Sequence, residues 1–201
     1  MPTMPEDVAK MFRSCAWFRK GPCLALTIIF WAVMSSASHA HAQAEGVGEY
    51  QVKAAFLYNF AKFVEWPPDP RPPARNSILV CVAGGDPFGR VLDQTILDKT
   101  ANGQRFVIQR FRGEEDVRGC QILFTGSSDQ TYLRSLLANL KGASVLTVGE
   151  SEGFLQLGGI INFTLEENRV RFEINVDAAE RARLKISSKL LSVAKVVRDK
   201  Q

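Results

Sequence analysis

Histidine is nearly absent from this 201-residue sequence, which has only His39 and His41. Both lie in a leader that we expect to be removed. A chain without imidazole lacks a Ser-His-Asp triad, a Cys-His nucleophile pair and any metal site built on histidine. The sequence therefore predicts no catalytic residue, no metal and no cofactor. It favours a protein that acts by binding.

Cysteine is also scarce, because only Cys81 and Cys120 follow the leader. Cys81 lies inside one predicted strand and Cys120 opens another. Two cysteines in an exported chain suggest one disulfide, which forms if those strands are neighbours. The alternative that the sequence leaves open is a pair of buried free thiols.

Long apolar runs are missing apart from Cys23–Met34, which is shorter than the roughly 20 residues of a transmembrane helix. Basic residues precede this run, and two A-x-A patterns follow it, ending at Ala42 and Ala44. This arrangement predicts a cleaved secretory signal peptide over residues 1–44, with translation from Met11 as a variant. An uncleaved membrane anchor is the alternative. Residues 45–201 then form a single domain.

A strong excess of charge of either sign is lacking. After residue 44 the chain has 21 basic and 19 acidic residues, but residues 176–201 alone have seven basic and three acidic. The basic tail favours anionic ligands, lipid headgroups or an acidic partner. The excess is too small for nucleic acid, which we do not expect as a partner.

The most distinctive stretch is residues 49–67, in which apolar residues recur at helical spacing. Its predicted apolar face consists of Val52, Ala55, Phe56, Phe60 and Phe63. Pro67 and Pro68 end this helix, which we expect to pack across the core. Core packing alone explains the pattern. A role in a partner or ligand surface is the alternative for Asn59, Lys62 and Trp66.

The middle of the chain alternates strands and helices, which predicts an α/β fold with a largely parallel, doubly wound (Rossmann-like) sheet flanked by helices. The predicted strands cover residues 77–83, 104–111, 121–125 and 143–148. One helix begins with Asp86 as N-cap and Pro87 at its first position, and another begins with a Ser127/Gln130 capping box. The Gly84–Gly89 turn lacks the lysine of a phosphate-binding loop.

Carboxylates provide one enzymatic alternative, a hydrolase with two close acidic residues. The densest acidic run, residues 114–116, lies on a predicted surface turn, which favours a solvated loop instead.

The tail predicts an antiparallel hairpin, residues 159–165 and 169–176, followed by two C-terminal helices. The first is a short helix with Asp177 and Glu180 as caps, and the second covers about 187–198. The polar side of the hairpin carries Asn162, Thr164, Arg171, Glu173 and Asn175. This side is either an ordinary solvated face or a recognition surface for a polar ligand or charged partner.

Two stretches resemble the ends of YfiR-like proteins: KAAFLYNFAKFVEWP (residues 53–67) and GGIINFTLEENRVRFEINVDAAERARLKISSKLLSVAKVV (residues 158–197). The resemblance implies a small periplasmic α/β protein that forms a homodimer. It also implies repression of an inner-membrane, YfiN-like diguanylate cyclase through its periplasmic region, with an outer-membrane YfiB-like protein as a further partner. Repression of the cyclase would lower the level of cyclic di-GMP and reduce biofilm formation. The matching C-terminal half adds Arg183 and Lys185 to the expected surface. A periplasmic small-molecule sensor or carrier, with the polar hairpin face as its pocket, is the alternative.

Overall fold

The computed structural model describes residues 37–68, 76–111 and 116–199, with side chains from Gly48 onward. By contacts the chain divides into two units, Met1–Ala44 and Glu45–Gln201, and the second contains the sheet. Most of the predicted leader lies outside the described residues, so its cleavage stays a prediction. Residues 114 and 115 of the predicted acidic turn also lie outside them.

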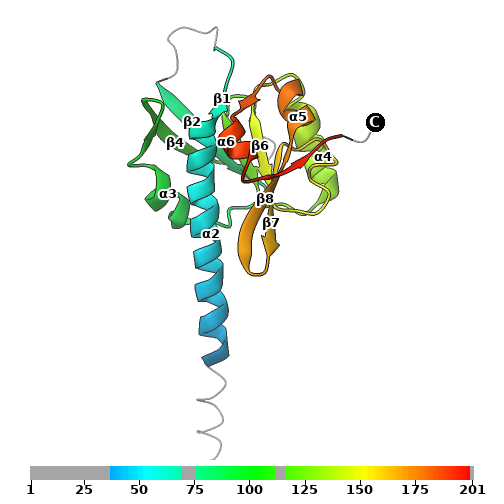
Figure 1. The fold of residues 1–201 in the computed structure, drawn as a ribbon. Helices are drawn as coiled ribbons and strands as arrows, with labels where there is room; N and C mark the ends of the chain where they lie inside the picture. Colours follow the sequence, from blue (N-terminus) through cyan, green and yellow to red (C-terminus); the bar gives the residue numbers. More distant parts are fainter. Residues whose placement is uncertain (1–36, 69–75, 112–115, 200–201) are drawn as a thin grey trace, which may run out of the picture. The chain divides into compact units, whose positions relative to one another are not determined.

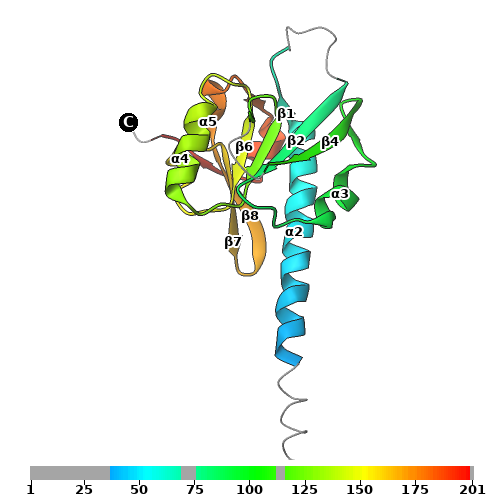
Figure 2. The same cartoon turned by 180° about the vertical axis from the view of Figure 1, so that it is seen from behind.

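An eight-stranded sheet in the order β10-β8-β7-β6-β5-β2-β4-β3 organises the second unit (Figures 1 and 2). Its five parallel strands are β2 (Ser77–Ala83), β4 (Gln104–Arg110), β5 (Ile122–Thr125), β6 (Leu146–Gly149) and β7 (Ile161–Glu166). The other three are β3 (Thr100–Ala101), β8 (Arg169–Asn175) and β10 (Lys195–Val197). β8 and β3 are antiparallel to β7 and β4, and β10 is parallel to β8. The predicted mostly parallel sheet and C-terminal hairpin are confirmed.

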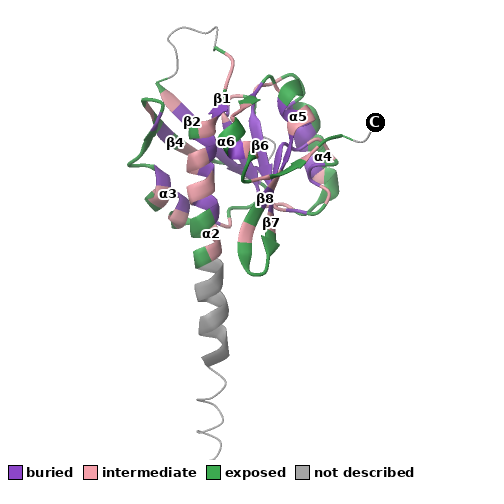
Figure 3. Ribbon diagram, viewed as in Figure 1, coloured by how far each residue is buried: buried purple, intermediate pink, exposed green. Residues whose placement is uncertain are grey.

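The helices are α2 (Ala37–Phe63), α3 (Arg90–Ile96), α4 (Gln130–Asn139), α5 (Val176–Arg181) and α6 (Ser188–Leu191). Alternate residues of the strands pack on opposite faces of the sheet. On β2, Val80 contributes to the core cluster that contains residues of α2, whereas Cys81 contributes to the cluster that contains residues of α4. The strands are therefore buried between two helical layers, as Figure 3 shows. None of the described helices combines the length and apolar character that a membrane span requires.

The buried face of α2 differs from the predicted one. Ala54, Leu57, Phe60 and Ala61 are fully buried, whereas Val52 is 45% exposed. Ala55, Phe56 and Phe63 are only half-buried. The helix is apolar nearly all round, so periodicity did not determine its orientation. Small alanines on the buried side let the helix lie close to the sheet, which decides the orientation instead.

The helix also ends earlier than the prolines predicted, at Phe63. Val64 and Glu65 form the short strand β1, which pairs antiparallel with β9 (Lys185–Ile186). The small β1–β9 sheet lies at the amino-terminal end of the parallel strands in Figure 1. Backbone pairing with β9 therefore competes with continuation of the helix.

The predicted caps of three helices were wrong. Gly89 is the N-cap of α3, and Asp86 instead accepts hydrogen bonds from the Phe88 and Gly89 amides, at 2.9 and 3.1 Å. The caps of α4 and α5 are Asp129 and Asn175. Asp129 accepts the Thr131 and Tyr132 amides, and Asn175 accepts the Ala178 amide, so polar residues other than the predicted ones cap these two helices.

The last predicted helix is also shorter than expected. It covers only Ser188–Leu191, and Lys195–Val197 pairs with β8 as the edge strand β10. An open edge at β8 gives these residues backbone partners that the sequence alone does not reveal.

Cys81 and Cys120 form a disulfide, with their Cα atoms 6.0 Å apart. The bond forms because β2 and β5 are neighbours and Cys120 lies immediately before β5. The predicted pairing is therefore present in the structure. Both residues are buried, at 0% and 3% exposed.

Candidate functional site

The carboxyl end of β6 lies beside the part of α2 that contains Tyr50 and Lys53. Glu150 directly follows β6, and its carboxylate accepts hydrogen bonds from Lys53 Nζ at 2.6 Å and from Tyr50 Oη at 3.1 Å. Lys53 also pairs with Glu49, one helical turn earlier. Open α/β sheets place ligand and partner sites at this edge. We refer to Glu49, Tyr50, Lys53 and Glu150 as the Lys53 cluster.

Burial makes the Lys53 cluster electrostatically unusual. Lys53 is only 5% exposed, although lysine is among the side chains least often buried. Its Nζ lies 4.6 Å from the centre of the Tyr50 ring, within range of a cation–π contact. Burial, followed by the negative charge of Glu150, raises the pKa of the Tyr50 hydroxyl far above its usual value. Tyr50 therefore stays protonated and donates to Glu150. With two carboxylates and one ammonium, the cluster retains a net negative charge.

Sequence reasoning missed both Lys53 and Glu150. Lys53 shares helical spacing with Leu57, Phe60 and Val64, all of which are buried, so its place on an apolar face was a usable signal. Glu150 follows a fully buried strand, which was a second signal. Neither signal identifies the partner, because the two residues are 97 positions apart in the sequence.

A hairpin pocket of about 360 Å³ lies beside the Lys53 cluster. Its polar lining includes Glu150, Asn162, Thr164 and Glu173. Asn162 is 8% exposed, and its Oδ1 atom has no hydrogen-bond partner among the described residues. The Thr164 hydroxyl is buried and unpartnered in the same sense. Buried polar atoms normally have partners, so this pocket is suited to a polar group from outside.

Four of the five predicted hairpin residues come together at this edge. Asn162 lies opposite Glu173 and Thr164 opposite Arg171 in the β7–β8 ladder. Arg171 is exposed, and Glu173 pairs with Lys195 at 2.5 Å.

Asn175 does not join this surface. It is 2% exposed, its Oδ1 accepts the Ala178 amide at 3.0 Å, and its Nδ2 donates to Asp199 at 2.7 Å. Asn175 therefore acts as the N-cap of α5, which corrects its expected place on an open face.

The remaining predicted residues lie elsewhere. Trp66 is half-buried and donates its ring N–H to the Gln121 carbonyl at 3.2 Å, while Lys185 belongs to β9. Lys62 is exposed near the end of α2, with Nζ 5.4 Å from the centre of the Tyr58 ring, and Asn59 is half-buried. Arg183 donates to the Gly142 carbonyl at 3.0 Å. The structure does not bring these five residues into the hairpin surface.

The loop that carries Glu150 is held by close packing. Phe154 is fully buried, and a Cβ atom at Gly159 would lie 2.2 Å from its ring. A Cβ atom at Gly149 would lie 2.7 Å from the same ring. Only glycine at these two positions lets the ring lie flat against the backbone, which fixes the start and the end of the loop.

We expect Gly159→Ala to lower the free energy of unfolding by about 2 kcal/mol, because the new methyl group displaces the Phe154 ring. Urea denaturation measures this change. Gly48→Ala is the matched control, since no atom lies within 4 Å of a Cβ built at that position. A Gly159→Ala variant as stable as the control would contradict the packing described.

Among the described residues, no group of three or more His, Cys, Asp or Glu side chains lies close enough together to hold a metal ion.

Comparison with known proteins gives a family match and matches to solved structures. A family described as YfiR/HmsC-like matches residues 50–195, which agrees with the resemblance drawn from the two ends of the chain. A crystal structure described as a conserved domain protein from Vibrio cholerae O1 biovar El Tor aligns with a TM-score of 0.44 and 12% identity. The alignment covers 59% of this chain and 54% of that one, so the chain spans about half of the solved protein's length.

Proposed function

Because the chain belongs to the YfiR/HmsC-like family, we propose that it represses an inner-membrane diguanylate cyclase by binding the enzyme's periplasmic region. Family membership indicates a periplasmic regulator of cyclic di-GMP signalling. Beyond that general role, this protein contacts the cyclase directly and lowers its activity. Repression lowers cyclic di-GMP and biofilm formation. An outer-membrane YfiB-like protein relieves it, and the repressor is a homodimer.

The observation that supports the contact surface is Asn162, which lines the hairpin pocket and whose buried Oδ1 has no hydrogen-bond partner among the described residues. A partner side chain that donates a hydrogen bond there would satisfy a buried acceptor, which is worth about 1–3 kcal/mol. Exposed Arg171 on the same face supplies a planar cation suited to a carboxylate of the partner. At the hairpin tip, Glu166, Glu167, Asn168 and Arg169 are exposed, so the tip is accessible to a large partner.

Charge reversal tests this surface. We expect Arg171→Glu to weaken binding to the periplasmic region of the cyclase about tenfold, because a carboxylate then faces the partner's acidic group. Isothermal titration with that purified region measures the change. Arg105→Glu is the matched control, since Arg105 is also an exposed strand arginine but lies on β4. Equal affinities for both variants would exclude the hairpin as the contact surface.

A small-molecule sensor or carrier is the second candidate, and the same pocket supports it. Its volume lies within the range of ligand pockets, roughly 300–1,000 Å³. Thermal-shift screening against polar metabolites separates the two functions. A ligand that stabilises the protein without changing cyclase output favours the carrier, whereas cyclase binding without any ligand favours the repressor.

A further inference from the structure

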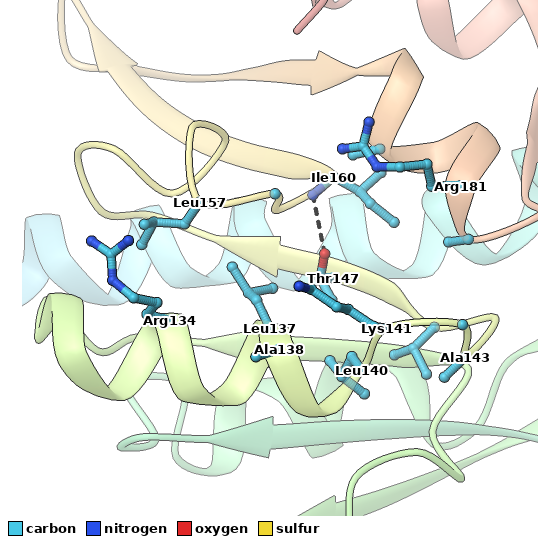
Figure 4. Close-up of a pocket in the computed structure, with 15 residues that line it drawn as sticks. Arg134, Leu137, Ala138, Leu140, Lys141, Ala143, Thr147, Leu157, Ile160 and Arg181 are labelled. Atoms are coloured by element: carbon cyan, nitrogen blue, oxygen red, sulfur yellow. Dashed lines mark hydrogen bonds between the residues drawn. The ribbon is translucent and has the colours of Figure 1, made fainter.

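A second cavity, of about 500 Å³, opens between α4, the segment from Leu157 to Ile160 and α5 (Figure 4). We call it the α4 cavity. It is distinct from the hairpin pocket, because the two share no lining residue. Its floor is apolar. Leu140, Val145 and Ile160 line it, and each is less than 10% exposed.

One stripe of α4 forms a wall of the cavity. Arg134, Leu137 and Ala138 recur at the spacing of a single helix face, and Lys141, two residues after the end of α4, continues this line. Figure 4 shows Arg134 at one end of this stripe and Lys141 nearer Arg181 of α5. The Arg134 and Lys141 side chains are exposed and have no hydrogen bond or ion pair among the described residues. Both charges are available to a ligand.

The charge of the cavity has one sign. Arg134, Lys141 and Arg181 line it, and no Asp or Glu does. Arg181 pairs with Asp199, which lies outside the lining. A cavity with an apolar floor and only cationic side chains at its rim selects ligands that are both apolar and anionic.

The carboxyl end of α4 would ordinarily oppose an anion, because its last carbonyl groups carry partial negative charge. Here two arginines donate hydrogen bonds to carbonyl oxygens at this end of the helix and just after it. Arg118 donates to the Asn139 oxygen at 2.8 Å and to the Lys141 oxygen at 3.4 Å. Arg183 donates to the Gly142 oxygen at 3.0 Å. These contacts neutralise the helix end and add two cations near Lys141.

The cavity also contains a hydroxyl group, that of Thr147, which is able to donate a hydrogen bond to an anion. The Thr147 hydroxyl accepts the Ile160 amide at 3.0 Å, as the dashed line in Figure 4 marks. Its own proton has no acceptor among the described residues. The polar side chains of the cavity therefore have donors to offer to a bound molecule, which needs acceptors.

We propose that the α4 cavity binds a small anionic amphiphile, an alkyl chain with one terminal carboxylate. The chain lies on Leu137, Leu140 and Ile160, and the carboxylate lies at the Lys141–Arg181 end. The volume is that of a small-molecule pocket and not of a flat protein contact. This activity is independent of cyclase binding, because the site lies apart from the hairpin.

Calorimetric titration of the purified protein with decanoate, below its micelle concentration, tests the proposal. We expect saturable binding of one decanoate per chain, and binding of decanol at least about tenfold weaker, since the alcohol lacks the charge that the rim selects. Absence of saturable decanoate binding, or decanol binding of equal strength, would overturn the proposal.

Variants assign the binding to this cavity. We expect Lys141→Gln with Arg181→Gln to weaken decanoate about tenfold or more and to leave decanol binding unchanged. The matched control is Arg90→Gln with Lys189→Gln, which removes two exposed charges from α3 and α6. Ala138→Trp places a large side chain from an exposed position into the cavity and should abolish binding of both compounds. Wild-type affinity in either cavity variant would contradict the assignment.

Discussion

Replacing Lys53 with methionine should lower the free energy of unfolding by about 3 kcal/mol, a large effect for one exchange of similar volume. The methionine fills the same space, so little apolar contact is lost. The cost arises because the carboxylates of Glu49 and Glu150 then share a largely dry site without a cation. Their side chains are only 29% and 17% exposed.

Urea denaturation measures this effect, and two further variants identify its cause. Lys62→Met removes an exposed lysine from the same helix and should change the free energy of unfolding by less than about 0.5 kcal/mol. Adding Glu150→Gln to Lys53→Met should recover part of the loss, because one unpaired carboxylate is removed. If the Lys53→Met and Lys62→Met variants had the same free energy of unfolding, the Lys53 cluster would not contribute to stability.

Reduction of the Cys81–Cys120 disulfide should cost about 4 kcal/mol of unfolding free energy. The bond closes a loop between residues 39 positions apart, and the cost follows from the loop entropy that the unfolded chain regains. Chemical denaturation with and without dithiothreitol gives the difference. A Cys81→Ala and Cys120→Ala double variant should show no response to the reductant.

The native thiol content provides an independent check on the bond. Protein isolated from the periplasm and unfolded without reductant should contain no free thiol in residues 45–201. Two free thiols per chain would restore the alternative of unpaired buried cysteines.

The sequence predicted those parts of the fold that depend on strongly patterned segments. Apolar runs such as Ser77–Ala83 define buried parallel strands, and strict alternation in Arg169–Asn175 defines a hairpin strand. The cysteines became partners because their strands are neighbours. Each of these features depends on local pattern together with general rules of sheet topology.

The sequence did not predict features for which two local structures, or two orientations of one helix, are nearly equal in energy. The α2 helix is apolar on most sides, so only contact with the sheet selects Leu57 and Phe60 over Val52. Lys195–Val197 becomes a strand because β8 has an open edge. The candidate site likewise has a part that the sequence predicted and a part that it did not. Pattern predicted Asn162 and Arg171 on one face, whereas the Lys53–Glu150 contact required the tertiary fold.

The most direct test of the central claim is the cyclic di-GMP content of cells that carry a membrane diguanylate cyclase encoded beside this gene. Deleting the gene should raise cyclic di-GMP, and restoring the wild-type protein in the periplasm should lower it again. The Arg171→Glu variant should fail to do so, although the Arg105→Glu control succeeds. Unchanged cyclic di-GMP after deletion, with the cyclase present and active, would contradict the proposed repression.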